Sequence, residues 1–230
     1  MTADTIDPFD PTAPVPDPAP WTITLPGDDR VLRFEVADPE GHAELMHDWM
    51  HQPHVAPWWG ADRDREGTVA YLRRQRASGH LVPWIVSHAT LGPQAGAGLD
   101  VAAPDDEAGP WTPFGFTELY RAAEDPLADH FPLTAADRGW HVLVGPPQTL
   151  GGGLPRLLGR AVLARLLASP GVDRVVCEPN EDNGRMLAFC RALGYESLGP
   201  VDLPDKRAVL MACTVDAFDA RWPGDRKAAS

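Results

Sequence analysis

The chain has 230 residues, is 43% hydrophobic and carries a formal charge of −13, with a pI near 4.9. This length can bury one sizeable core, and the acidic balance argues against sequence-independent nucleic-acid binding, which needs a basic surface. There is no apolar run long enough to cross a bilayer and no secretory leader, so we expect a cytoplasmic protein without membrane contact.

The three cysteines are widely spaced and lie in mostly apolar surroundings. Cys177, Cys190 and Cys213 form no Cys-x-x-Cys pair, and no His/Cys spacing resembles a zinc site. We therefore interpret them as reduced core residues and expect no metal.

The ends of the chain differ in composition from its middle. Residues 1–20 are rich in proline and acidic residues, which predicts a disordered or loosely attached arm. We expect a single domain over residues 21–222 and a short C-terminal tail over residues 223–230.

The domain begins with a predicted hairpin and a helix. Trp21–Leu25 and Val31–Val36 alternate around Pro26-Gly27-Asp28-Asp29, and a helix should start near Asp38. It leads into a turn-rich segment dense in imidazole and indole. Aromatic residues at a helix end usually pack, but His54 and Trp59 are also candidates for a wall of an acceptor pocket, and both interpretations stay open.

The next stretch alternates helix and strand. Glu118 and Tyr120 should share one face of the second of its strands. In order, the predicted elements are a helix over Thr68–Ala77 with an Arg-rich solvated face, a strand over Leu81–His88, a surface loop over Gly92–Gly109 and a strand over Phe114–Arg121.

A glycine-rich loop follows the next strand. Trp140–Val144 is short and apolar and ends at Gly145-Pro146-Pro147, and Gly151-Gly152-Gly153 then precedes leucines at helical spacing from Leu154. Residues without Cβ at a helix N-terminus allow backbone N–H groups to approach a phosphate closely. A strand-to-helix turn that binds nothing is the simpler alternative.

The last third predicts a second strand, a second helix and a hairpin. Val172–Glu178 is the strand, and Pro179-Asn180-Glu181-Asp182-Asn183 breaks it and offers N-caps for the helix Gly184–Leu193. Gly194 is suited to end that helix. A hairpin of Glu196–Asp202 and Arg207–Thr214 closes the pattern. The fold class expected is α/β (α+β): a mixed, mostly antiparallel central sheet with helices on both faces.

This order of Gln-x-x-Gly-x-Gly, helix, strand, Asn, helix and Gly-aromatic resembles the Gcn5-related N-acetyltransferase superfamily. The resemblance implies splayed central strands with the pantetheine arm of an acyl-CoA between them and its pyrophosphate on the glycine loop. The residues it assigns to acetyl-CoA or another acyl-CoA co-substrate are Val142, Val144, Gln148, Thr149, Leu150, Gly151, Gly152, Gly153, Leu154, Asn183 and Arg185.

One position departs from the superfamily pattern. Many members have a tyrosine acid seven residues after the Asn183-type residue, and here that position is Cys190. His141 and Glu178 lie in the two central strands instead and are the candidate acid–base pair. With a usual pKa near 6.5, the imidazole could remove a proton from the acceptor or the intermediate, while Glu178 orients the amine or the imidazole. The simpler alternative is that His141 only packs against Trp140.

Further segments resemble the siderophore-biosynthesis branch, including Asp137-Arg138-Gly139-Trp140-His141 and Leu203-Pro204-Asp205-Lys206-Arg207-Ala208. That branch acylates the side-chain amine or hydroxylamine of lysine, ornithine or a diamine to form a hydroxamate. The resemblance implies work alongside an N-hydroxylase and a siderophore synthetase, and an acceptor pocket with His54, Trp59, Glu118 and Tyr120. A complete glycine loop without a convincing cysteine nucleophile favours direct transfer in a ternary complex. It leaves open whether the protein is a monomer or a homodimer.

Two alternatives remain. The Trp49 to Gly60 segment and the last third also look like aminoglycoside 6′-N-acetyltransferases, although those enzymes generally keep the tyrosine that Cys190 replaces. A binding module that senses acyl-CoA without turnover is the other alternative, and turnover with any acceptor amine separates it from an enzyme.

Overall fold

The computed structural model describes residues 19–59, 63–91, 98–100 and 109–230. Most of the predicted arm and most of the predicted loop over 92–109 therefore lie outside the described residues. Within that loop, residues 98–100 form a strand that pairs with β1, so the loop prediction is wrong there.

The described elements follow the predicted order closely. The strands are β1 Trp21–Thr24, β2 Arg30–Val36, β3 Leu81–Thr90, β4 Gly98–Asp100, β5 Thr112–Arg121, β6 Asp137–Val144, β7 Arg174–Cys177, β8 Glu196–Asp202 and β9 Arg207–Thr214. The helices are α1 Ala43–Met50, α2 Ala56–Trp59, α3 Arg65–Ala77, α4 Leu154–Ala168, α5 Gly184–Leu193, α6 Val215–Arg221 and α7 Asp225–Ala228, with short 3-10 turns at Ala122–Glu124, Pro126–Asp129 and Pro147–Thr149.

Across the described residues the strands form one sheet in the order β4-β1-β2-β3-β5-β6-β7-β9-β8. Its pairs are antiparallel except β6 with β7, which run parallel because α4 carries the chain back between them. The expected mixed, mostly antiparallel sheet with flanking helices is confirmed.

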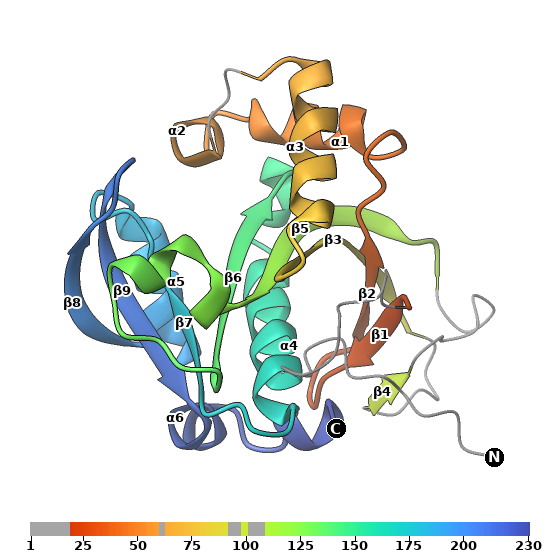
Figure 1. Ribbon diagram of the computed structural model, residues 1–230. Helices are drawn as coiled ribbons and strands as arrows, with labels where there is room; N and C mark the ends of the chain where they lie inside the picture. The colour runs from red at the N-terminus through yellow and green to blue at the C-terminus, as the bar shows by residue number, and fades with distance from the viewer. Residues whose placement is uncertain (1–18, 60–62, 92–97, 101–108) are drawn as a thin grey trace.

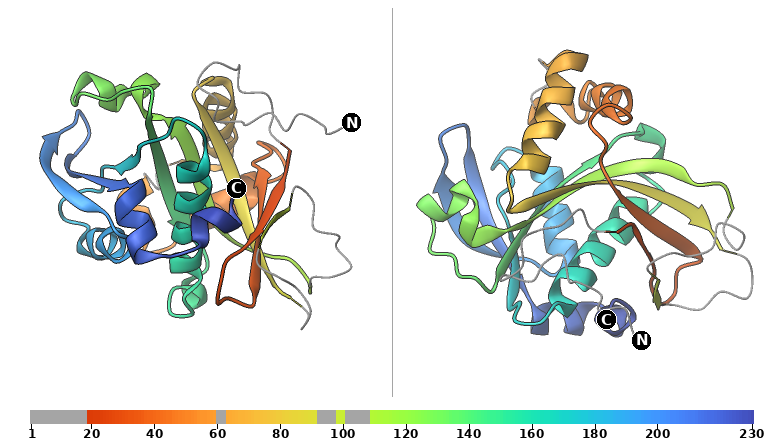
Figure 2. Two further views of the ribbon diagram at one scale, coloured as in Figure 1. Left: turned by 90° about the horizontal axis from the view of Figure 1, so that it is seen from below. Right: turned by 45° about the vertical axis from the view of Figure 1, so that its right-hand side comes forward.

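Apolar clusters cover both faces of the sheet. One contains the buried leucines of α4 together with Trp84 and Trp140, and the other joins α1 and α3 to Ile85, Phe116 and Leu143. Figures 1 and 2 show α1 and α3 packed side by side, away from α4 and the C-terminal helices.

The C-terminal segment predicted as a tail contains α7. Asp225 in this helix is buried and forms an ion pair with Arg160 of α4, with Nε 2.8 Å from Oδ2. The helix therefore packs on the domain.

The parallel pair is short, and this positions the site. Asp137 to Gly139 pair with Arg174 to Val176, and β6 then continues to Val144 paired with β5 alone. The Asp137–Arg174 ion pair, 2.6 Å from Oδ1 to Nε, fixes the two strands where they begin. Beyond Gly139 the strands separate, as Figure 1 shows.

The end of β6 is held by α1. A Cβ placed on Gly145 would be 2.2 Å from ring atoms of Trp49, so the indole packs directly against that backbone. The ring of buried Trp49 can lie there only because residue 145 has no side chain.

Candidate active site

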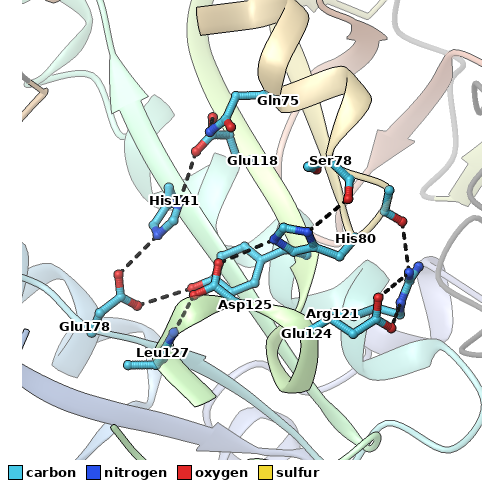
Figure 3. A network of polar contacts seen from close by, with 12 residues as sticks. Gln75, Ser78, His80, Glu118, Arg121, Glu124, Asp125, Leu127, His141 and Glu178 are labelled. Carbon is cyan, nitrogen blue, oxygen red and sulfur yellow. Dashed lines mark hydrogen bonds and ion pairs between the residues drawn. The ribbon is translucent and has the colours of Figure 1, made fainter. Parts of the chain in front are cut away.

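A histidine lies between two carboxylates where β6 and β7 separate. His141 on β6 is directly opposite Glu118 on β5, and its Nδ1 is 3.0 Å from Oε2 of Glu118. Its Nε2 is 3.1 Å from Oε1 of Glu178, the residue that follows β7. Figure 3 shows the imidazole bridging the two carboxylates. The predicted pair of His141 and Glu178 is thus brought into contact.

Glu118 is held from three sides. Glu118 is 1% exposed. Its Oε1 accepts hydrogen bonds from the hydroxyl of Tyr71 and, at 2.8 Å, from Nε2 of Gln75. Both donors lie on α3, four residues apart and therefore on one helix face. The donors leave Oε2 to His141, so Glu118 is directed at the imidazole.

Glu178 has an equally full set of partners. It is 7% exposed and contacts the hydroxyl of Tyr120 at 3.2 Å and Nζ of Lys206 at 3.4 Å, besides His141. A Cβ on Gly139 would be 2.1 Å from the ring of Tyr120, so that ring lies over the glycine backbone. The missing side chain at residue 139 lets Tyr120 reach Glu178.

The carboxylates keep His141 protonated. Burial alone would lower its pKa, but the charge of Glu178 and hydrogen bonds to Glu118 and Glu178 raise the pKa of His141 to about 10. For Glu178, burial would raise the pKa, and the charge and hydrogen bond of His141 together with Lys206 lower it to about 2. At neutral pH the group is an imidazolium between two carboxylates, which differs from the expected imidazole with a pKa near 6.5.

Glu118, His141 and Glu178, called the triad below, line a cavity of about 540 Å³. Its lining includes Trp59 and Glu118 from the predicted acceptor set, and Val142 and Asn183 from the predicted coenzyme set. Residues that the sequence did not assign to the site also line it: Pro57, Trp58, Arg63, Tyr71, Gln75, Trp140, Cys177, Pro179, Asn180, Met186, Cys190, Asp205 and Lys206.

Two predicted acceptor residues are placed elsewhere. His54 is not among the residues lining this cavity, and its Nε2 is 2.8 Å from the backbone oxygen of Val144 at the end of β6. Tyr120 is buried behind the triad, with its ring centroid 4.9 Å from that of His141. Tyr120 supports Glu178, and His54 connects the α1–α2 segment to β6.

The glycine loop lies outside the cavity lining, at the start of α4. Gly153 has φ of +77° and is the N-cap residue of α4, and a Cβ on Gly151 or Gly152 would meet nothing within 4 Å. Arg30, held by Asp28, donates from Nη1 to the backbone oxygen of Gly152 at 2.8 Å. Open space, a helix N-terminus and a nearby guanidinium suit a pyrophosphate.

The remaining predicted coenzyme residues lie on β6, on the segment between β6 and α4, and at the starts of α4 and α5. Asn183 is the N-cap of α5 through a bond from Met186 N, as predicted. Outside the cavity lining are Val144, Gln148, Thr149, Leu150, Leu154 and Arg185.

The cysteines are buried and unpaired by disulfide. Cys177 and Cys190 line the cavity with their Sγ atoms 3.6 Å apart. Burial raises the pKa of the Cys177 thiol well above its usual value, which disfavours the thiolate that a nucleophile needs.

A parallel strand pair that opens beside Glu118, His141 and Glu178, with a glycine loop at the start of the following helix, is the arrangement of acyl-CoA-dependent acyltransferases. A family model described as an acetyltransferase (GNAT) domain matches residues 38–90 and 110–203. The chain belongs to this family, whose members are enzymes that use acyl-CoA.

Several curated proteins with named acyltransferase activities are similar to this chain. The N(6)-hydroxylysine O-acetyltransferase of Escherichia coli is 33% identical over 180 residues, which cover 78% of this chain and 50% of that protein. Lysine N-acyltransferase MbtK of Mycobacterium sp. (strain MCS) is 27% identical over 82% of this chain and 69% of its own. The N-hydroxyputrescine acetyltransferase of Acinetobacter baumannii is 26% identical over 76% and 73%. The chain thus spans half the length of the first relative.

Solved structures share the fold. An uncharacterized protein from Bacillus halodurans superposes with a TM-score of 0.75 at 25% identity, covering 92% of this chain and 98% of that one. The aminoglycoside acetyltransferase AAC(6′)-Ib with coenzyme A superposes with a TM-score of 0.64 at 23% identity, covering 82% and 98%. The second structure supports the fold, and coenzyme A is bound in it.

Two features are absent from the residues that the structure describes. None of their helices is both long and apolar enough to cross a bilayer. Within the same residues, no group of three or more His, Cys, Asp or Glu side chains is arranged to hold a metal ion.

Proposed function

We propose that this chain transfers the acetyl group of acetyl-CoA to the side-chain hydroxylamine or amine of lysine, ornithine or a diamine, as a step towards a hydroxamate siderophore. Acylation of a hydroxylamine gives the hydroxamate directly, and acylation of an amine gives an amide. The observation that carries the proposal is the position of His141 between Glu118 and Glu178 at the opening of β6 and β7. The relatives that act on hydroxylysine and hydroxyputrescine supply the acceptor class.

The roles proposed for the triad follow from its charges. With a pKa near 10, His141 is already protonated at neutral pH and cannot accept a proton from the acceptor. His141 therefore acts as the acid that protonates the departing CoA thiolate. It takes the place of the tyrosine that Cys190 replaces. Glu118 and Glu178 hold the imidazolium, and Glu178 also faces the acceptor cavity.

The same charges favour a neutral acceptor nitrogen. His141 and Lys206 both contact Oε1 of Glu178, so two cations already share that carboxylate. A lysine ammonium, with a usual pKa of about 10.4, would add a third positive charge and must first lose a proton. A hydroxylamine is less basic and arrives neutral, which supports acylation after N-hydroxylation.

Direct transfer in a ternary complex fits the cysteines. Cys177 and Cys190 are buried with their Sγ atoms 3.6 Å apart. Burial raises the pKa of the Cys177 thiol well above its usual value, which disfavours the thiolate that a nucleophile needs. We therefore expect no acyl-enzyme, and a stoichiometric acyl-Cys190 adduct formed with acyl-CoA alone would contradict this step.

The cavity charges bear on the aminoglycoside alternative. A polycationic acceptor calls for an acidic cleft, whereas this cavity is lined by three carboxylates, Glu118, Glu178 and Asp205, and by the cationic side chains Arg63, His141 and Lys206. The balance supports a small acceptor with few positive charges.

The test is a matrix of CoA release. Acetyl-CoA and succinyl-CoA are each combined with lysine, N6-hydroxylysine, N-hydroxycadaverine, N5-hydroxyornithine and kanamycin. We expect a hydroxylamine to be acylated far faster than its parent amine. Activity confined to kanamycin would support the aminoglycoside alternative, and binding of acyl-CoA without turnover of any acceptor would support a non-catalytic module.

A further inference from the structure

Lys206 places a primary amine in the reaction centre. It lies in the turn between β8 and β9, and its Nζ is 3.4 Å from Oε1 of Glu178, the same oxygen that Nε2 of His141 contacts at 3.1 Å. Lys206 also lines the cavity that passes the triad. An amine of the chain therefore lies in the same cavity as His141, the proposed acid.

The turn holds Lys206 in this position. The N–H of Leu203 donates to the backbone oxygen of Lys206 at 2.9 Å, and the N–H of Glu181 donates to the backbone oxygen of Arg207 at 3.0 Å. These bonds connect the turn to itself and to the loop after β7, so the backbone at Lys206 is fixed relative to Glu178. A fixed amine in a reaction site gains the rate advantage of an intramolecular reactant.

The sequence makes this amine unusual. The chain has two lysines, Lys206 and Lys227. Lys227 belongs to α7, which packs near α4, and is not among the residues that line the cavity. Lys227 therefore provides an internal reference for acylation by free acyl-CoA in solution.

We propose that Lys206 is an internal acceptor, which the enzyme acylates when acyl-CoA is bound and no external acceptor is present. This inference rests on the proposed acyl transfer from acyl-CoA. After the ammonium has lost a proton to solvent, Nζ attacks the thioester carbonyl carbon and the C–S bond breaks. The thiolate takes its proton from His141, which regains one from the new amide nitrogen, and the products are N-acyllysine and CoA.

Acylation of Lys206 changes the site that carried it out. The amide has no positive charge, so Glu178 loses the ion pair with Nζ and keeps His141 and Tyr120 as partners. The acyl group also occupies cavity space beside the triad. Self-acylation therefore lowers later activity, and a bound external acceptor protects against it.

The experiment uses the full chain and acetyl-CoA as the probe. Purified protein is incubated with acetyl-CoA without acceptor, and peptide mass spectrometry measures acetylation at both lysines over time. We expect Lys206 to be acetylated faster than Lys227 by at least about tenfold, because only Lys206 shares a site with the thioester. Lys227→Arg should leave the modification unchanged, Lys206→Arg should abolish it, and an acceptor turned over in the matrix should slow it.

The outcomes separate this inference from the proposed function. Turnover of an external acceptor with equal or no acetylation at the two lysines would overturn the inference and leave the proposed function standing. Selective acetylation of Lys206 without turnover of any acceptor would support the inference and contradict the proposed acceptor class. Absence of both reactions would overturn both.

Discussion

Replacing Glu118 by glutamine should make His141 easier to deprotonate. Oε2 of Glu118 faces Nδ1 of His141 at 3.0 Å, while Oε1 accepts from Tyr71 and Gln75. A glutamine that keeps its oxygen towards the two donors turns its amide NH₂ towards Nδ1. That amide can donate but cannot accept, so Nδ1 must be unprotonated and the neutral imidazole is favoured.

The size of the effect follows from the geometry. An opposite charge at this distance typically changes a pKa by about 1 to 3. The side chain of His141 is 34% exposed to the cavity, so solvent screens part of the interaction and the expected fall is nearer 1 than 3. The pKa of His141 should thus drop from about 10 in the parent by this amount.

Two measurements check this prediction. NMR titration of the histidine ring should report the lower pKa directly. Because His141 is proposed to act as an acid, activity is lost as pH rises through its pKa, so the alkaline limb of the kcat/KM profile should move to lower pH in Glu118→Gln.

A matched control is Glu124→Gln. Glu124 is exposed and paired with Arg121, and its loss should leave the titration of His141 unchanged. If Glu118→Gln behaves like Glu124→Gln in both measurements, Glu118 does not set the protonation of His141 and the triad has been misinterpreted.

Three further predictions follow from the glycines and the charges. Gly151→Val should weaken acetyl-CoA binding in calorimetric titration with little loss of stability, because a Cβ at residue 151 would point into open space. Gly153→Val should weaken binding and also destabilise the fold by about 1 to 2 kcal/mol, because residue 153 has a positive φ. Equal affinity of both variants and the parent would exclude the loop from the coenzyme site. Gly139→Ala should displace the ring of Tyr120 and cost about 1 to 3 kcal/mol in urea unfolding, and unchanged stability would show that the ring has room. The raised pKa of His141 stabilises the fold fully below about pH 6.5 and loses this contribution as pH rises towards about 10, so the free energy of unfolding should fall over that range in the parent and less in His141→Asn.

Most of the helices and strands could be predicted from the local sequence pattern. The helix Gly184–Leu193 has its predicted cap at Asn183 and its predicted end at Gly194, because capping chemistry and helical spacing are local properties. The docking of α7 through Asp225 and Arg160 was missed, since a pair 65 positions apart leaves no periodic pattern.

The site was predicted in part for the same reason. His141 and Glu178 could be identified because the two strands predicted on either side of the glycine loop contain them; in the structure Glu178 directly follows β7. The contact of His141 with Glu118 depends on the register of β5 and β6, which are joined by a segment with 3-10 turns that sets no hairpin register. Tyr71 and Gln75 fall in a helix whose arginines suggested a solvated face, although their spacing of four places them together.

The wall formed by α1 and α2 limits how this enzyme can be re-engineered. Trp49 packs on Gly145, and His54 bonds to the backbone oxygen of Val144, so the segment that carries Trp59 into the cavity is fastened at two points to the last residues before the glycine loop. Substitutions that move this wall to admit a new acceptor also shift the strand end expected to hold the coenzyme. Substitutions in this segment should therefore change acceptor specificity and coenzyme affinity together. Variant libraries that randomise the segment need to be selected for both properties.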